Sequence, residues 1–331
     1  MEHKPVKLTA NEKAYLWTNY MVDSMAVCCL SYYIEKCEDS EIHDILSFAL
    51  DLSKKHTQFV KETFTKEKYP VPIGFTEADV NLQAPKLFSD EFVLLYLHNL
   101  ANEGLMYYSK ALSMTAREDV HDFYVKCISS STELNTRTKM LLLSKGLYIR
   151  PPYIPDSNHP EMIEELGFMK GFLGKQRPLI SMEIANLYFN LITLEVVKTL
   201  MIGFAQVASN KDVKDFITRG KDLCNKTIEQ FSSILQKEEL PASKPWYTHV
   251  TDSTESPFSD KLLMFHGSVL NAGGVEQYGF SLASSIKRDI GARYAQLITE
   301  MLTYSDDGMN LMIKHQWLEQ PPMNVDRGEL K

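Results

Sequence analysis

Long stretches of the chain carry apolar side chains at every third or fourth position, a spacing that places them on one face of an α-helix. One such face runs through Ile42, Ile45, Ala49, Leu52, His56, Phe59 and Thr63, and another through Val93, Leu97, Leu100, Gly104, Tyr107, Ala111 and Met114. Both faces have the apolar stripe typical of a helix that packs in a bundle. The pattern predicts helices near residues 10–37, 40–65, 89–115, 118–146, 181–208, 211–237, 259–285 and 288–316.

The second half of the chain repeats the first. At an offset of 171 residues, Glu12 aligns with Glu183 and Asn19 with Asn190; at an offset of 170, Phe88-Ser89-Asp90 aligns with Phe258-Ser259-Asp260, Tyr108 with Tyr278 and Pro151-Pro152 with Pro321-Pro322. We place the one-residue slip between residues 76 and 87. The repeat predicts an internal duplication in an all-α chain: a first four-helix bundle at 1–150, a linker with a short helix at 151–180, and a second bundle with an extended tail at 181–331.

The repeated Phe-Ser-Asp triplet predicts a helix start. Ser89 and Ser259 are expected to cap the third helix of each repeat, and the Asp that follows favours the first turn. Each Phe is expected to pack against the apolar residue five positions later, Val93 or Leu263. The Pro-rich stretches before the triplets, 66–88 and 238–258, are long enough to traverse a bundle, as in folds whose second and third helices run parallel.

Charge and composition narrow the classes of function. A net charge of −8 and a pI near 5.7 leave no basic stripe for phosphate backbones, which argues against a nucleic-acid partner. The longest apolar run, "LITLEVVKTLMIGFAQVA", contains Glu195 and Lys198, so we expect no membrane span. The five cysteines (Cys28, Cys29, Cys37, Cys127 and Cys224) lack metal-site spacing and indicate buried, reduced thiols in a cytoplasmic protein.

A di-iron site is the first chemistry to consider in such bundles, since it needs Glu-x-x-His pairs that point inward. The one Glu-x-x-His pair in a helical stretch is Glu118–His121, at the start of a helix, and its repeat partners are Arg288 and Gly291. His56 and His98 also fall on apolar faces and are replaced by Thr227 and Ser268 in the second repeat. With antiparallel second and third helices the two histidines could share a metal, but with parallel ones they lie about 12 Å apart. We interpret them as core histidines and predict no metal site.

Sequence motifs of catalysis or nucleotide binding are absent: the chain has no GxSxG elbow, Walker loop, HExxH or dinucleotide fingerprint. We therefore assign no catalytic, cofactor-binding or metal-binding residues and expect no cofactor. The prediction is a non-enzymatic structural or interaction protein that self-associates. Tyr15, Trp17, Trp246 and Trp317 are candidate anchors for that contact, or else plugs of the bundle ends. A metal-binding oxidoreductase and a small-ligand-binding bundle with an aromatic pocket stay open as alternatives.

Several segments together resemble a known family: the repeat itself, "PIGFTEADVNLQAPKLFSD", "GKQRPL", "SPFSDKLLMFH" and "WLEQPP". The chain resembles, over nearly its whole length, an uncharacterised tandem-domain family of spore-forming bacilli. The resemblance implies ferritin-like four-helix bundles, distantly similar to spore coat protein F, in a sporulating host. It implies no activity and no catalytic residues. Spore components are the partners that it suggests.

Overall fold

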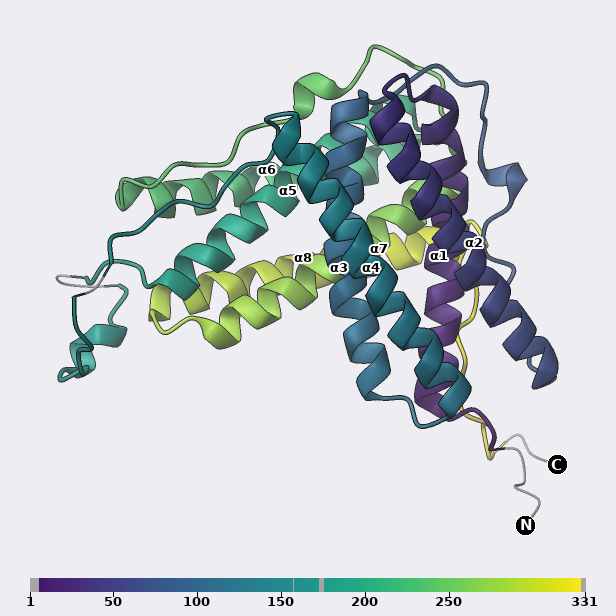
Figure 1. Cartoon of the computed structure of the whole chain (residues 1–331), viewed down its shortest axis with the longest axis horizontal. Helices are drawn as coiled ribbons and strands as arrows, with labels where there is room; N and C mark the ends of the chain where they lie inside the picture. The colour runs from purple at the N-terminus through teal and green to yellow at the C-terminus, as the bar shows by residue number, and fades with distance from the viewer. Residues whose placement is uncertain (1–5, 157, 173–175, 329–331) are drawn as a thin grey trace.

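The computed structural model describes residues 6–156, 158–172 and 176–328. Within these ranges the chain forms two four-helix bundles and no extended sheet (Figure 1). The first contains α1 (Ala10–Lys36), α2 (Ser40–Lys66), α3 (Asp90–Ser113) and α4 (Glu118–Ser144), and the second contains α5 (Ser181–Val207), α6 (Lys211–Lys237), α7 (Asp260–Ser284) and α8 (Arg288–Lys314). Every predicted helix is confirmed, and its boundaries differ by two residues at most.

The duplication is visible in the helix starts, which follow their counterparts by 171, 171, 170 and 170 residues. The predicted position of the one-residue slip was wrong. The 3-10 turns η1 (Glu77–Asp79) and η3 (Tyr247–His249) are already 170 residues apart, as are the residues that precede them, Thr76 and Trp246. The slip therefore lies before Thr76, in the Pro-rich part of the crossover, where no helix constrains the length.

The crossovers make the second and third helices parallel, as predicted. Asp90, in the first turn of α3, accepts hydrogen bonds from the backbone N–H groups of Glu38 and Asp39, directly before α2. Asp260 accepts in the same way from Ser209 and Asn210, directly before α6. The two helices of each pair thus start at the same end of their bundle.

The Ser of each triplet is confirmed as a cap, and the Phe takes part in ring contacts; its expected packing on Val93 or Leu263 stays a prediction. Ser89 accepts from the N–H of Phe92, and Ser259 from that of Leu262. The Phe88 ring lies 5.0 Å from the Phe92 ring and 6.2 Å from Phe204 in the other repeat. Each triplet is therefore both a helix start and a contact between the bundles.

The two crossovers interlock about a pseudo-two-fold axis. Val80 pairs with Phe258, and Phe88 with Val250, in isolated antiparallel bridges. The cap hydroxyls join in: Ser259 donates to Asp79 at 2.8 Å, and Ser89 lies 2.8 Å from His249. Asp79 and His249 occupy equivalent positions of the two repeats. Each cap hydroxyl therefore contacts the same position of the other repeat, which carries a carboxylate in one case and an imidazole in the other.

The core is continuous across the two bundles. Tyr33 and Phe88 of the first repeat pack with their counterparts Phe204 and Phe258 of the second, with ring centroids 6.2–6.5 Å apart in each of the four contacts between them. Gly203 allows this approach, since a Cβ there would lie 2.5 Å from the Phe88 ring. The bundles are thus one body in spite of their separation along the sequence.

The chain ends of each repeat cross to the other repeat. After α4, Ile149 and Ile154 pack against the core of the second bundle. After α8, Glu319 accepts from the N–H groups of Ile73 and Gly74 in the first crossover. The short helix expected in the linker is limited to a 3-10 turn, η2 (Leu166–Met169), because no neighbouring helix covers this segment (Figure 1).

Helix α5 is long and apolar enough, by length and composition alone, to cross a membrane. In the fold, 72% of its most apolar stretch is buried. It contacts α6 and α7 in its own bundle and α3 in the other. Its central position accounts for its composition.

Candidate functional site

One polar cluster lies inside the first bundle, with one side chain from each helix. This His56 cluster consists of Asp23 (α1), His56 (α2), Tyr108 (α3) and Cys127 (α4). Asp23 Oδ2 lies 3.3 Å from His56 Nδ1, and Cys127 Sγ lies 3.4 Å from His56 Nε2. The Tyr108 hydroxyl lies 3.4 Å from Nδ1. Carboxylate, imidazole and thiol thus follow one another in the order used by thiol nucleophiles.

The environment of the cluster opposes that chemistry. Cys127 is fully buried inside the bundle, and burial, followed by the charge of Asp23, raises the pKa of the Cys127 thiol. A thiol acts as a nucleophile only as the thiolate, so Cys127 is held in its inert form. Asp23 and Cys127 also contact opposite nitrogens of the ring, so the contacts are those of a hydrogen-bond network and not of one shared ion.

Sequence reasoning identified His56 but missed Asp23 and Cys127. The signal was present in the repeat: their counterparts in the second bundle are Leu194 and Leu297, and that of His56 is Thr227. A polar residue that replaces leucine on a core face needs a partner, and the three polar replacements in the first bundle partner one another.

The other candidate residues lie apart from the cluster. His98 contacts Thr138 Oγ1 at 2.9 Å and shares no partner with His56. Glu118 and His121 are exposed at the start of α4, where His121 lies 3.7 Å from Asp122. Within the described ranges, no group of three or more His, Cys, Asp or Glu side chains is arranged to hold a metal ion.

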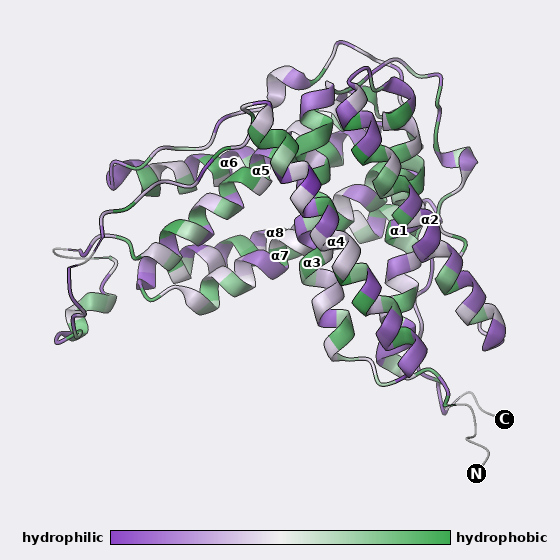
Figure 2. Ribbon diagram, viewed as in Figure 1, coloured by the Kyte–Doolittle hydropathy of each residue, from purple (hydrophilic) through white to green (hydrophobic). Residues whose placement is uncertain are grey.

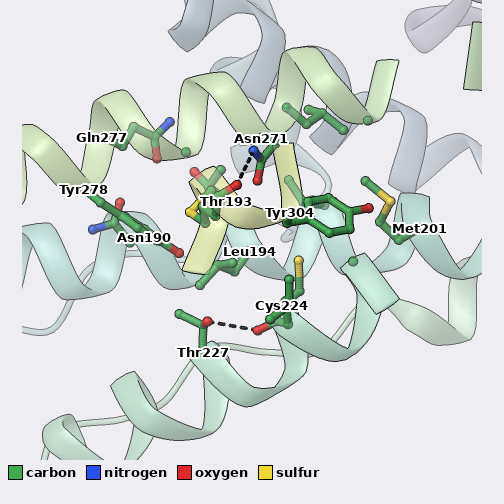
Figure 3. A pocket seen from close by; sticks show the side chains of 17 residues that line it. Asn190, Thr193, Leu194, Met201, Cys224, Thr227, Asn271, Gln277, Tyr278 and Tyr304 are labelled. Atoms are coloured by element: carbon green, nitrogen blue, oxygen red, sulfur yellow. Dashed lines mark hydrogen bonds between the residues drawn. The ribbon is translucent and has the colours of Figure 1, made fainter. Parts of the chain in front are cut away.

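The second bundle contains a small cavity where the first has its cluster. It has a volume of about 60 Å³ and is lined by apolar side chains with a few polar ones, among them Asn190, Thr227 and Gln277 (Figure 3). The counterparts of Thr227, Gly267 and Gln277 in the first bundle are the larger His56, Leu97 and Tyr107. Smaller side chains on the same framework explain the space.

The proposed aromatic anchors are used inside the chain. Trp246 is buried in the shared core, so the expectation that it anchors an outside contact is wrong. The Tyr15 ring packs on Tyr107 at 5.5 Å, and Trp317 stacks on His315 at 4.4 Å. These contacts favour the other interpretation, in which the aromatic residues fill the bundles and their ends.

Comparison with known proteins identifies the family. Residues 1–159 and 167–330 each match the family described as "Protein of unknown function (DUF3231)", and the chain belongs to this family as a tandem of two copies. No curated protein matches the chain.

A crystal structure from Bacillus halodurans C-125, described as a "putative spore coat protein", is similar at 17% identity with a TM-score of 0.41. The similarity covers 46% of this chain and 98% of that one. At these values the likeness carries no functional argument. The more specific description of the bundles as ferritin-like stays a prediction.

Proposed function

We propose that the chain is a non-enzymatic structural protein that self-associates through the linker between its repeats. The observation that carries the proposal is an exposed apolar segment, here called the linker arm (residues 153–156 and 158–172). Met162 and Leu166 are 88% and 85% exposed, and Tyr153, Ile163 and Phe172 are exposed as well. The arm projects from the body in Figure 1, and Figure 2 shows hydrophobic residues in its 3-10 turn.

The arm is fixed at its base. Arg177 forms a bidentate ion pair with the buried Glu183 at 2.8 and 2.9 Å, and its guanidinium stacks on Phe168 at 4.3 Å. The Arg177 Nε also donates to the carbonyl of Phe168. A segment held in this way presents its apolar side chains with part of the ordering cost already met, which favours association.

Exposed apolar side chains that gather on one segment mark contact surfaces more often than isolated ones do. Each copy carries the same arm, so two arms can cover each other about a two-fold axis, which is the commonest symmetry of homo-oligomers. The sealed His56 cluster supports the non-enzymatic part of the proposal, since its thiol and imidazole are out of reach of a substrate.

We extend the proposal to the spore because of the resemblance to a family of spore-forming bacilli described above. The chain is then a component assembled with other copies during sporulation. Detection of the protein in purified spores, and its absence from vegetative cells, tests this extension. Equal amounts in vegetative cells and none in spores contradict it without touching the proposal of self-association.

Size-exclusion chromatography with light scattering tests self-association. We expect the full-length protein to have at least twice the mass of one chain, and Leu166→Ser combined with Met162→Ser to shift it toward the monomer. Met140→Ser, at an exposed position of α4, is the matched control and should leave the mass unchanged. A monomer at every accessible concentration contradicts the proposal.

A further inference from the structure

A cleft of about 420 Å³ lies where the two bundles meet, between α3, α4, α5 and the segment that follows α4. Its size is within the usual range for small-molecule sites, about 300–1,000 Å³, and such sites often lie at domain interfaces. Aromatic side chains make up much of its wall: Tyr148, Tyr188, Phe189 and Trp246. Phe189 is exposed and Tyr148 is half-buried, so these two rings offer an apolar surface to the body of a ligand, whereas Tyr188 and Trp246 are buried and expose little of their rings to the cleft.

Apart from Thr193 of α5 and the tyrosine hydroxyls, the polar side chains of the cleft come from α3 and α4. They are His98, Asn99, Asn102, Asn135 and Lys139, and no carboxylate is among the lining residues. Lys139 makes no ion pair within the described part of the chain. It is the one charged side chain that lines the cleft. The electrostatics therefore favour a ligand with a negative charge.

Asn99 supplies a buried donor that lacks a partner. Its side chain is 5% exposed; the Oδ1 atom accepts from Thr193 at 3.3 Å, but Nδ2 has no hydrogen-bond partner. A buried donor without a partner costs about 1–3 kcal/mol. An acceptor on a ligand in the cleft relieves this cost.

His98 does not compete with Lys139 for the anion. The Thr138 hydroxyl already donates to the carbonyl of Leu134, so His98 Nδ1 carries a proton and donates to Thr138. Burial, helped by the nearby Lys139, lowers the pKa of His98 to about 4, so the ring is neutral at physiological pH. Lys139 is left as the cation of the cleft.

The polar set belongs to one repeat. The counterparts of Asn99, Asn102 and Lys139 in the second repeat are Val269, Ala272 and Met309, and those of His98 and Asn135 are Ser268 and Ser305. The same helices therefore pack without these side chains. The amides and the lysine are not a requirement of the fold.

We propose that this cleft binds a small organic anion with an aromatic or alkyl body, such as an apolar carboxylate. The body lies against the aromatic wall, and the carboxylate accepts from Lys139 Nζ and Asn99 Nδ2. This inference is independent of self-association, because the cleft and the linker arm are formed by different residues.

Calorimetry on the full-length protein tests the site with two anions, 4-phenylbutyrate and octanoate, and their neutral counterparts 4-phenylbutan-1-ol and 1-octanol. We expect one anion per chain, bound at least ~10-fold more tightly than its alcohol, as a charge-assisted hydrogen bond allows. Lys139→Met should remove this preference and leave the alcohols unchanged. Asn99→Val should weaken anion binding. Both variants introduce the residue that the second repeat has at that place, so the fold should be retained.

Two controls locate the site. Lys126→Met removes an exposed charge from α4 outside the cleft and should have no effect. The indole N–H signal of Trp246 in NMR spectra should shift with ligand, whereas the signals of Trp17 and Trp317 should not. The proposal is overturned if neither anion binds in the millimolar range, or if Lys139→Met leaves the preference intact.

Discussion

Replacement of Glu183 by Gln tests how much this buried carboxylate contributes to the stability of the fold. Glu183 is fully buried and accepts from Arg177, from the N–H of Ile180 at 3.1 Å and from the N–H of Lys287 at 2.9 Å. It thereby joins the base of the linker arm, the start of α5 and the turn between α7 and α8. Gln keeps the volume but leaves Arg177 without its counterion. Loss of one partner from a buried pair costs about 3–5 kcal/mol.

The equivalent Glu12 provides the matched comparison. It accepts from the N–H groups of Thr9, Ala116 and Arg117 at 2.7–3.0 Å, but among the described residues no arginine side chain pairs with it. Glu12→Gln is therefore expected to cost less, about 1–3 kcal/mol. Urea unfolding followed by circular dichroism gives both values as changes in the free energy of unfolding.

The pH dependence of this destabilisation distinguishes the effect of the Glu183 charge from that of the side-chain shape. Burial raises the pKa of Glu183, but hydrogen bonds from Arg177 and the backbone outweigh it, so the net pKa is lowered from 4.5. A carboxyl group with a lowered pKa stabilises the fold above its unfolded-state pKa, and this stabilisation is lost as the pH falls through the folded-state value. The difference between wild type and Glu183→Gln should thus be largest at neutral pH and shrink below about pH 4.5. A difference under about 0.5 kcal/mol, typical of surface substitutions, or one that is independent of pH, refutes the reasoning.

Two further predictions concern the cavity and the shared core. Gly267→Ala should stabilise the protein by about 1 kcal/mol through helix propensity, since the new Cβ meets only a methyl group of Met201 at 3.4 Å. Gly220→Ala should destabilise it, because the new Cβ would lie 2.4 Å from the Tyr304 hydroxyl. Thermal unfolding of both variants distinguishes these outcomes. Residues 1–150 expressed alone should dimerise or aggregate because Tyr33 and Phe88 lose their partners in the second repeat; a stable folded monomer in sedimentation experiments speaks against the shared core.

The helices and their caps were predictable because they depend on local information. Apolar periodicity, the repeat and the position of Ser89 are all readable within one segment of chain. The interlocked crossovers were not predictable in this way. Val80 and Phe258, or Asp79 and Ser259, are brought together by the packing of one repeat on the other, and nothing in the spacing of either stretch specifies a partner so far along the chain.

The same distinction applies to the candidate sites. His56 was recognisable as a polar residue on an apolar face, but the identity of its partners depended on the order in which four helices surround the bundle axis. The cleft was harder still, since Asn99 and Lys139 come from one bundle and Tyr188 from the other. A site between two domains becomes visible only once their relative placement is known.

Photo-cross-linking from the linker arm tests the central claim, self-association through this segment, most directly. A photoreactive amino acid is placed at position 166 in the full-length protein, and at Val125 on the exposed face of α4 as the control. We predict cross-linked products of two or more chains from position 166 and none from position 125. Efficient labelling within single chains only, or equal intermolecular products from both positions, contradicts the account.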